Sequence, residues 1–422
     1  MLDIKFIREN PEVVEQGLRA KNTPCDLSEL LDLDKERRAL LSEVEKLKSE
    51  RNQANDQIAQ LRKDGQKEQA DGIISQMKAI SQKIKEIDAL VGGLSEKIDT
   101  ITHIIPNLPH ADAGVGPGNS ANKVVKRWGE PRKFAFKAKD HVEIGENLGW
   151  LSMEKGSKIT GSAFPVYEGG GARLQRALIN FMMELHTEKH GYKEIWPPAL
   201  VNRLSMTGTG QLPKFEEEMY KLKDDDYFLI PTAEVPITNL HRDEIFKEED
   251  LPRQYVAYSP CFRREAGSYG KDTRGLSRVH QFDKIELVQF VKPENGLAAL
   301  ETLRSHAETV LQLLELPYRV VLLGTGDMSF AAAKCYDLEV WAPASEKWFE
   351  VSSCSWFGDF QARRIHARYR NPETKKPEYV HTLNGSGVAL ARTVLCLLEN
   401  YQDKQGKFVI PKALETYLGK IE

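Results

Sequence analysis

The segment from Leu33 to Ile101 constrains the fold most, because it contains no proline and no aromatic residue and is rich in charged and amide side chains. Two series of mainly apolar residues run through it with alternating spacings of four and three. The first series extends from Leu33 to Leu61 and the second from Ile73 to Ile101. Such alternation gives a mean period of about 3.5 residues, which is typical of a coiled-coil seam. The segment therefore predicts two long amphipathic helices.

A short polar link, from Lys63 to Gly72, allows the second helix to fold back on the first. We therefore predict an antiparallel two-helix arm within about residues 30–102, with legs of roughly 40–50 Å. The alternative is a coiled coil that only joins two copies of the chain. The equal seams and the short link favour the arm. Basic and amide side chains on its polar faces suit a phosphate backbone, although ordinary solvation explains most such charges.

A stretch rich in proline, glycine and asparagine follows at residues 103–124 and excludes a helix there. We therefore predict an N-terminal domain at 1–108, a linker at 109–133 and a globular domain at 134–422. Short β-rich runs joined by short loops dominate this last part, with amphipathic helices starting near residue 169 and lying near 295–315 and 387–402. This order predicts an α+β fold around a mainly antiparallel sheet.

Composition limits the class of protein. The chain has 422 residues, which is long for one domain, and 59 basic against 62 acidic side chains. With a formal net charge of −3, any contact with nucleic acid must come from local basic patches. Five scattered cysteines without zinc-site spacing predict free thiols and no structural metal. The charged N-terminus and the lack of a long apolar run predict a soluble cytoplasmic protein.

Arginine is concentrated between two β-rich runs, in the stretch from Cys261 to Phe282. If the flanking runs are antiparallel strands, residues two apart share a face. Alternation then places Arg263 and Glu265 on one face of the first strand. A second face would carry Arg278, His280, Phe282, Lys284 and Glu286.

These residue types suit a nucleotide and an amine together. Arginine forks bind phosphate, a phenylalanine ring stacks on a base, and a carboxylate accepts from an amino or ammonium group. The alternative is a surface hairpin with solvated charges. The long, glycine-containing basic loop at Ala266–Ser277 argues against it. No P-loop or Rossmann glycine pattern is present, so the arginines must bind the nucleotide themselves.

At this point the chain resembles the class II aminoacyl-tRNA synthetases, in the bacterial form of the seryl-tRNA synthetase family. "FRREAGS…DTRGLSRVHQFDKIE" resembles motif 2 and "GYKEIWPPALV" resembles motif 1, with Pro198 as its proline. "LNGSGVALARTVLCLLEN" resembles motif 3, with Arg392 as its arginine. "TGTGQLPKF", "IPTAEVP", "FEVSSCSWFGDFQARR" and the arm extend the similarity over nearly the whole chain.

The resemblance implies a class II catalytic domain, an N-terminal tRNA-binding domain and a homodimeric, ATP-dependent ligase. Such an enzyme forms seryl-adenylate and pyrophosphate from L-serine and ATP with Mg²⁺. It then transfers serine to the 3′ end of tRNA(Ser), and also of tRNA(Sec), while the arm holds the tRNA. The alternatives are a related enzyme that loads another carrier, and an inactive paralogue that only binds. The arm argues against the first, and Arg263, Arg278 and Arg392 argue against the second.

The resemblance also implies roles for single residues. Arg263 would hold the α-phosphate and the serine carboxylate, Glu265 would accept from the adenine amino group, and Phe282 would stack on adenine. Arg263, Arg392 and Glu350 would be catalytic, and Glu350 and Ser353 would bind the metal. The implied ATP-binding set is Arg263, Arg264, Glu265, Arg278, Val279, Phe282, Glu350, Val351, Ser352, Ser353 and Arg392, with Arg264 facing outward. The implied serine-binding set is Thr232, Ala233, Glu234, Arg263, Glu286 and Ser386. No cysteine is needed as a nucleophile, and His280 is expected to be structural.

Overall fold

The computed structural model describes residues 1–266 and 274–419. The chain forms two compact units. One comprises Leu2–Arg19 and Thr23–Ile105, and the other comprises Met1, Ala20–Asn22 and Pro106–Glu422. Among the described residues, no helix is long and apolar enough to cross a membrane.

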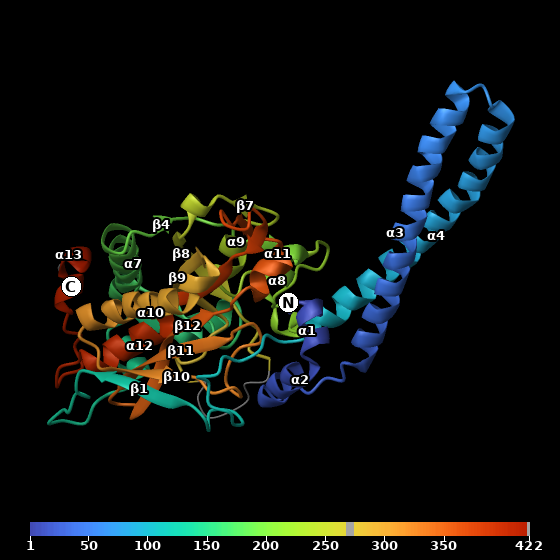
Figure 1. Ribbon diagram of the computed structural model, residues 1–422. Coiled ribbons are helices and arrows are strands. Elements are labelled where there is room, and N and C mark those ends of the chain that lie inside the picture. Colours follow the sequence, from blue (N-terminus) through green and yellow to red (C-terminus); the bar gives the residue numbers. More distant parts are fainter. Residues whose placement is uncertain (267–273, 420–422) are drawn as a thin grey trace. The chain divides into compact units, whose positions relative to one another are not determined.

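The first unit contains the predicted arm. Two short helices, α1 (Ile4–Glu9) and α2 (Pro11–Ala20), precede α3 (Ser28–Lys63) and α4 (Lys67–Ile104). Figure 1 shows α3 and α4 running antiparallel and joined at one end. Their 36 and 38 residues correspond to about 54 and 57 Å, longer than the sequence predicts.

The seam of the arm is apolar, as the spacing predicts. Val44 of α3 packs with Ile84 and Ile87 of α4. The link is shorter than predicted, because α4 already begins at Lys67 and Gly65 alone makes the left-handed turn, with φ of 77°. Because the partner stripe comes from the same chain, the arm is intramolecular and does not need a second copy.

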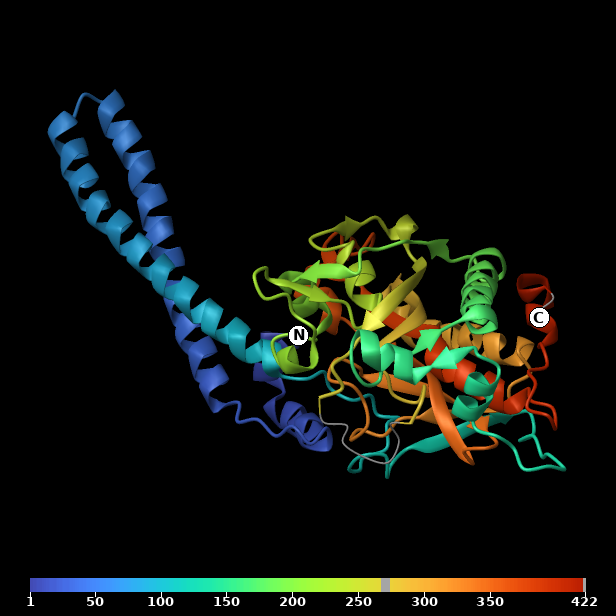
Figure 2. The same ribbon diagram turned by 180° about the vertical axis from the view of Figure 1, so that it is seen from behind.

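Two features interrupt this seam. Near the start of α3, the buried Asp34 pairs with Arg8, Arg37 and Arg38 at 2.7, 2.9 and 3.0 Å. The 4/3 spacing places Arg37 in the first series of seam positions, but its side chain belongs to this ion cluster. Towards the turn, α3 and α4 separate around a groove of about 350 Å³ (Figures 1 and 2). Its lining comprises Arg51, Asn55, Ile58, Ile74, Met77, Lys78, Ser81, Gln82 and Lys85.

The second unit is built on an eight-stranded sheet with the order β1-β10-β11-β12-β15-β9-β8-β4. All neighbours are antiparallel except β4 and β8. The strands are β1 (Lys123–Trp128), β10 (Tyr318–Leu322), β11 (Lys334–Ala342), β12 (Lys347–Trp356), β15 (His381–Ala389), β9 (Gln281–Val291), β8 (Arg253–Phe262) and β4 (Lys193–Glu194). The α+β class and the antiparallel sheet are therefore confirmed.

Three small sheets and short helices surround this sheet. The small sheets contain β2 (Leu151–Ser152), β3 (Val166–Tyr167), β5 (Leu200–Asn202), β6 (Tyr227–Leu229), β7 (Ile245–Phe246), β13 (Arg368–Arg370) and β14 (Pro377–Tyr379). The helices are α5 (His141–Asn147), α6 (Met153–Ile159), α7 (Gly169–Glu184), α8 (Arg203–Thr209), α9 (Glu234–Asn239), α10 (Gly296–Leu313), α11 (Phe360–Ile365), α12 (Leu390–Asn400) and α13 (Glu415–Leu418), with a π-helical turn at Leu185–Lys189. Short 3₁₀ turns lie at Glu216–Glu218, Glu248–Asp250, Pro293–Asn295 and Lys412–Leu414.

The main core lies where α7, α10 and α12 pack on the sheet. Leu303 of α10 and Val394 of α12 join Leu287 of β9 in one apolar cluster. The glycines that open α7 are required by this packing, because a Cβ at Gly170 would lie 2.2 Å from the ring of Trp150. The segment predicted as a linker, 109–133, contains β1, which pairs with β10 at the sheet edge.

Candidate active site

The predicted site residues lie on three neighbouring strands, β12, β15 and β9, on the helix after β15, in the β8–β9 connection and at the start of α9. Phe282 and Glu286 belong to β9, Ser386 belongs to β15, and Arg392 belongs to α12. The run Glu350–Ser353 belongs to β12. Strand pairing thus places Ser386 opposite Glu286, a hundred positions away in the sequence.

The predicted alternation in the arginine-rich stretch is wrong beyond the strand ends. Strand β8 ends at Phe262 and β9 begins at Gln281, so Arg263, Glu265 and Arg278 lie in the connection. Glu265 has φ of 50°, which breaks the two-residue period. Within β9, Phe282 and Glu286 keep the common face that was predicted for them. Part of the predicted basic loop, 267–273, lies outside the described residues.

The three arginines of the site contact other predicted site residues, namely one aromatic ring and two carboxylates. The Arg263 guanidinium lies 5.2 Å from the centre of the Phe282 ring. Arg278 Nη1 lies 2.8 Å from Glu265 Oε2. Arg392 Nη1 donates to the carbonyl oxygen of Glu350 at 2.9 Å and lies 3.2 Å from its Oε2. The three arginines therefore converge on groups that were assigned to the same nucleotide.

The other residues predicted to bind ATP differ in whether their side chains are accessible. The side chains of Val279 and Val351 are buried in the core, which leaves their backbones for any contact. Arg264 is exposed, and its backbone N–H donates to the Glu218 carbonyl oxygen at 3.1 Å. Ser352 Oγ donates to the Ser386 carbonyl oxygen at 2.5 Å, so β12 and β15 are joined beside the site.

A buried polar cluster lies next to these arginines. Lys284 Nζ is 2.6 Å from Glu286 Oε2 and donates to Thr232 Oγ1 at 2.9 Å. Asn384 Nδ2 donates to Glu286 at 2.9 Å and to Glu234 at 3.0 Å. Ser386 lies opposite Glu286 in the β15–β9 register. The predicted serine-binding residues Thr232, Glu234, Glu286 and Ser386 are therefore close together, and Ala233 is buried beside them.

The charge of this cluster depends on Glu234. Burial, followed by the neighbouring charge of Glu286, raises the pKa of Glu234 to about 7. A hydrogen bond from Gln361 at 2.6 Å and the positive charges of Lys284 and Arg263 act in the opposite direction. Because Arg263 acts on Glu234, the arginine site and this polar cluster adjoin each other.

Comparisons with known proteins agree over the whole chain. The family described as the seryl-tRNA synthetase N-terminal domain matches residues 1–109, and the class II core domain of G, H, P, S and T synthetases matches residues 215–401. A curated serine–tRNA ligase of Pelobacter propionicus is 54% identical over 422 residues, covering 100% of this chain and 99% of the relative. The chain belongs to the seryl-tRNA synthetase family.

Solved structures of family members have the same fold. A seryl-tRNA synthetase from Pyrococcus horikoshii, complexed with ATP, has a TM-score of 0.91 at 38% identity, covering 100% of this chain and 99% of that one. The cytoplasmic serine–tRNA ligase of Naegleria fowleri, in complex with AMP, has a TM-score of 0.85 at 29% identity, with coverages of 99% and 98%. Both cover the arm as well as the catalytic unit.

Sequence reasoning missed several polar residues of this candidate site. Lys284 was placed on the correct strand without a role, and Asn384 and Gln361 were not identified. Asp337 of β11 lies opposite Ser353 of β12. Burial, followed by the charge of Glu350, raises the pKa of Asp337 well above the usual range. The motif-3 stretch contains Asn384, so its amide beside a glycine-rich strand was the available signal.

The cysteines and histidines near the site have structural partners. Burial raises the pKa of the Cys261 thiol and raises that of Cys354 to about 12, which agrees with the expectation that neither is a nucleophile. His280 Nδ1 lies 3.0 Å from the carbonyl oxygen of Arg263. Behind Ser386, His186 Nε2 donates to the Gly387 carbonyl oxygen at 3.0 Å. Burial lowers the pKa of His186 to about 3, so this ring is neutral.

Proposed function

We propose that this chain activates L-serine with ATP and transfers the activated serine to tRNA. The observation that carries the proposal is family membership over the full length, at 54% identity to a curated serine–tRNA ligase. The family models of the N-terminal domain and of the class II core both match, at residues 1–109 and 215–401. The reaction forms seryl-adenylate with release of pyrophosphate, and the serine then passes to the 3′ end of tRNA(Ser).

In the proposed first step, the serine carboxylate attacks the α-phosphate of ATP. Both groups are anionic, so positive charge must offset their repulsion and stabilise the transition state. Arg263, which contacts the Phe282 ring and whose charge acts on Glu234, is assigned to the α-phosphate and the serine carboxylate. Arg278 and Arg392 are assigned to the terminal phosphates. No protein nucleophile is required, because positioning supplies much of the rate.

Adenine recognition is assigned to the β8–β9 connection. Phe282 presents a ring for stacking, and Glu265 presents an acceptor for the exocyclic amino group. Glu265 pairs with Arg278 at 2.8 Å. Binding of ATP would therefore break this ion pair. Arg278 would then contact a phosphate, and Glu265 would accept from the adenine amino group.

Serine recognition is assigned to the buried polar cluster. Glu286 and Glu234 provide negative charge for the ammonium group, with Thr232 beside them. Ser386, opposite Glu286 in the strand register, is assigned to the substrate hydroxyl. Alanine has no hydroxyl and would leave the buried partner unpaired, which favours serine.

Mg²⁺ is proposed to bind with ATP at β12. Glu350 offers a carboxylate and Ser353 a hydroxyl, and Mg²⁺ commonly takes one or two carboxylates together with substrate phosphates. Within residues 1–266 and 274–419 no group of three His, Cys, Asp or Glu has metal-site geometry, which fits a metal that arrives with its nucleotide. When bound, the ion would neutralise phosphate charge.

The arm is proposed to bind tRNA, and the catalytic unit is proposed to form a homodimer in the cytoplasm. The groove between α3 and α4 presents Arg51, Lys78 and Lys85, which suit a phosphate backbone. Motif 1 leaves Trp196 exposed, with 77% of its surface accessible, as expected for a contact with a second copy. Charging of tRNA(Sec) stays a prediction.

One screen tests the proposal. Exchange of labelled pyrophosphate into ATP is measured with each of the twenty amino acids, and serine alone should support it. Charging of tRNA(Ser) should follow. Exchange with serine without charging of tRNA would favour an enzyme that loads another carrier. Failure of serine to support exchange would favour an inactive paralogue.

A further inference from the structure

The part of the β8–β9 connection that leads into β9 is bonded to helix α5 through His141. The backbone N–H of Leu276 donates to His141 Nε2 at 3.1 Å. His141 Nδ1 lies 3.1 Å from Glu399 Oε1 on α12. An N–H group can only donate, so Nε2 must accept, and Nδ1 therefore carries the proton and donates to the carboxylate. The two bonds select one neutral tautomer of a buried ring, whose side chain is 5% exposed.

Glu399 is held on its other sides as well. Its Oε2 accepts from the backbone N–H groups of Ala344 and Ser345 at 3.0 and 2.9 Å. Its Oε1 also accepts from Ser345 Oγ at 2.7 Å. The side chain of Glu399 is fully buried. A carboxylate with this many donors is fixed in place, so it provides a rigid support for His141.

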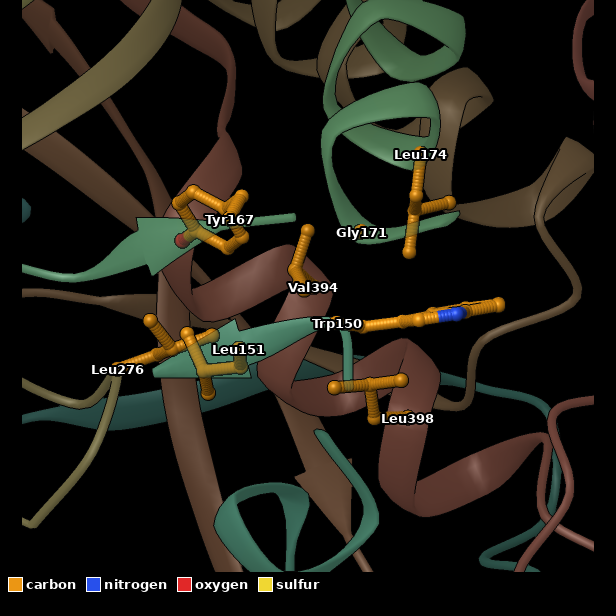
Figure 3. A pocket seen from close by; sticks show the side chains of 8 residues that line it. All are labelled: Trp150, Leu151, Tyr167, Gly171, Leu174, Leu276, Val394 and Leu398. Carbon is orange, nitrogen blue, oxygen red and sulfur yellow. The ribbon is translucent and has the colours of Figure 1, made fainter. Parts of the chain in front are cut away.

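The segment that His141 holds leads directly into the nucleotide site. Leu276 inserts its side chain among Leu151, Val394 and other apolar residues, which leave a cavity of only about 10 Å³ (Figure 3). The next residue, Ser277, accepts from Arg392 Nε through its carbonyl oxygen at 3.0 Å. Arg278 follows and pairs with Glu265. Consecutive residues therefore connect the His141 bond to two of the arginines assigned to ATP.

Helix α12 holds this segment at two points. Glu399 acts through His141 on Leu276, and Arg392 acts directly on Ser277. Positions seven residues apart lie on the same side of a helix, so both contacts come from one face of α12. The segment also passes very close to the ring. Gly275 has φ of 63°, and a Cβ there would lie 2.3 Å from His141 Nε2, so only glycine fits.

We infer that His141 is a positioning residue for adenylate formation, and that with Glu399 it fixes residues 276–278 so that Arg278 and Arg392 face the nucleotide. This inference rests on the proposed function. His141 itself is assigned no contact with substrate. Its effect should therefore appear in the use of ATP, with serine binding and overall stability much less affected.

Two amide substitutions separate the two bonds of the ring. In His141→Gln, the longer side chain reaches the position of Nε2 and can still accept from Leu276. In His141→Asn, the amide reaches only the position of Nδ1, so it can donate to Glu399 but cannot accept from Leu276. Both variants replace the imidazole ring by a side-chain amide. Each therefore serves as a control for the effect of the lost ring packing in the other.

Pyrophosphate exchange with serine is measured for both variants, together with their thermal midpoints. We expect His141→Asn to lower kcat/KM for ATP at least tenfold with KM for serine within twofold. His141→Gln should stay within threefold of the wild type in kcat/KM for ATP, and the two thermal midpoints should be similar. Unchanged ATP kinetics in His141→Asn, or equal losses in the two variants, would overturn the inference.

A second measurement does not depend on a folded variant or on turnover. Hydrogen–deuterium exchange of the wild-type protein should show the Leu276 amide protected, because its N–H is bonded and buried. Exchange at the rate of an unbonded amide would overturn the anchor. A wild-type enzyme that lacks serine-dependent pyrophosphate exchange would refute the proposed function, whereas loss of Leu276 protection would refute only this inference.

Discussion

Lowering the pH from 8 to 6 should weaken the binding of serine, because Glu234 must be ionised to hold an ammonium group. Burial and the nearby Glu286 raise the pKa of Glu234 to about 7. With that value, about nine tenths of the free enzyme is ionised at pH 8 and about one tenth at pH 6. We therefore expect kcat/KM for serine to fall roughly tenfold between these two values.

The turnover number should change much less over the same range. In the proposed complex, serine would place its ammonium beside Glu234 and keep the carboxylate ionised, so the titration belongs to the free enzyme. Pyrophosphate exchange measured from pH 6 to 8.5 at constant ionic strength separates kcat/KM from kcat. In Glu234→Gln the group no longer titrates, so the serine profile should be flat and KM higher throughout.

A wild-type serine profile that stays flat between pH 8 and 6 would refute this reasoning. So would a profile that keeps its wild-type shape in Glu234→Gln. The same pKa shift has a consequence for folding with a definite sign. Because the folded pKa lies above that of the unfolded chain, about 4.3, the contribution of Glu234 to the free energy of unfolding is complete below that pH and is lost as the pH rises to about 7.

Three further perturbations test other parts of the molecule. Replacing residues 51–79 of the arm with a short turn should leave serine-dependent exchange unchanged and lower tRNA charging at least tenfold, while equal activity in both assays would refute the role of the arm. Arg392→Ala should lower exchange by about 10²–10³, as for other lost transition-state donors, with the exposed Arg19→Ala as control; normal exchange would remove Arg392 from the site. Since burial lowers the pKa of His186 to about 3, its contribution to stability is lost as the pH falls below about 6.5. Urea unfolding at pH 7 and 5 should therefore show an added loss of about 2 kcal/mol in the wild type that is absent in His186→Asn.

The sequence predicts the parts of this fold that depend on local spacing. The arm follows from the 4/3 alternation, which Val44, Ile84 and Ile87 satisfy in the seam. The antiparallel sheet follows from β-rich runs joined by short connections. The positions of Phe282 and Glu286 on one face of β9 follow from the two-residue period alone.

Other features depend on contacts that no local pattern encodes. Strand β1 consists mostly of exposed residues and pairs with β10, whose sequence lies nearly two hundred positions away. Asn384 of β15 joins Glu286 of β9 and Glu234 of α9. Glu265 leaves the strand alternation through a left-handed backbone, which a non-glycine residue rarely adopts. Each of these required the tertiary structure.

The pairing of Arg278 with Glu265, and of Arg392 with Glu350, bears on how the reaction ends. On the assignments proposed above, Glu350 would be available to Arg392 again once pyrophosphate and its Mg²⁺ depart, whereas Glu265 would still hold the adenine of seryl-adenylate. Release of pyrophosphate would then leave Arg392 paired with Glu350, which lowers the energetic cost of that departure.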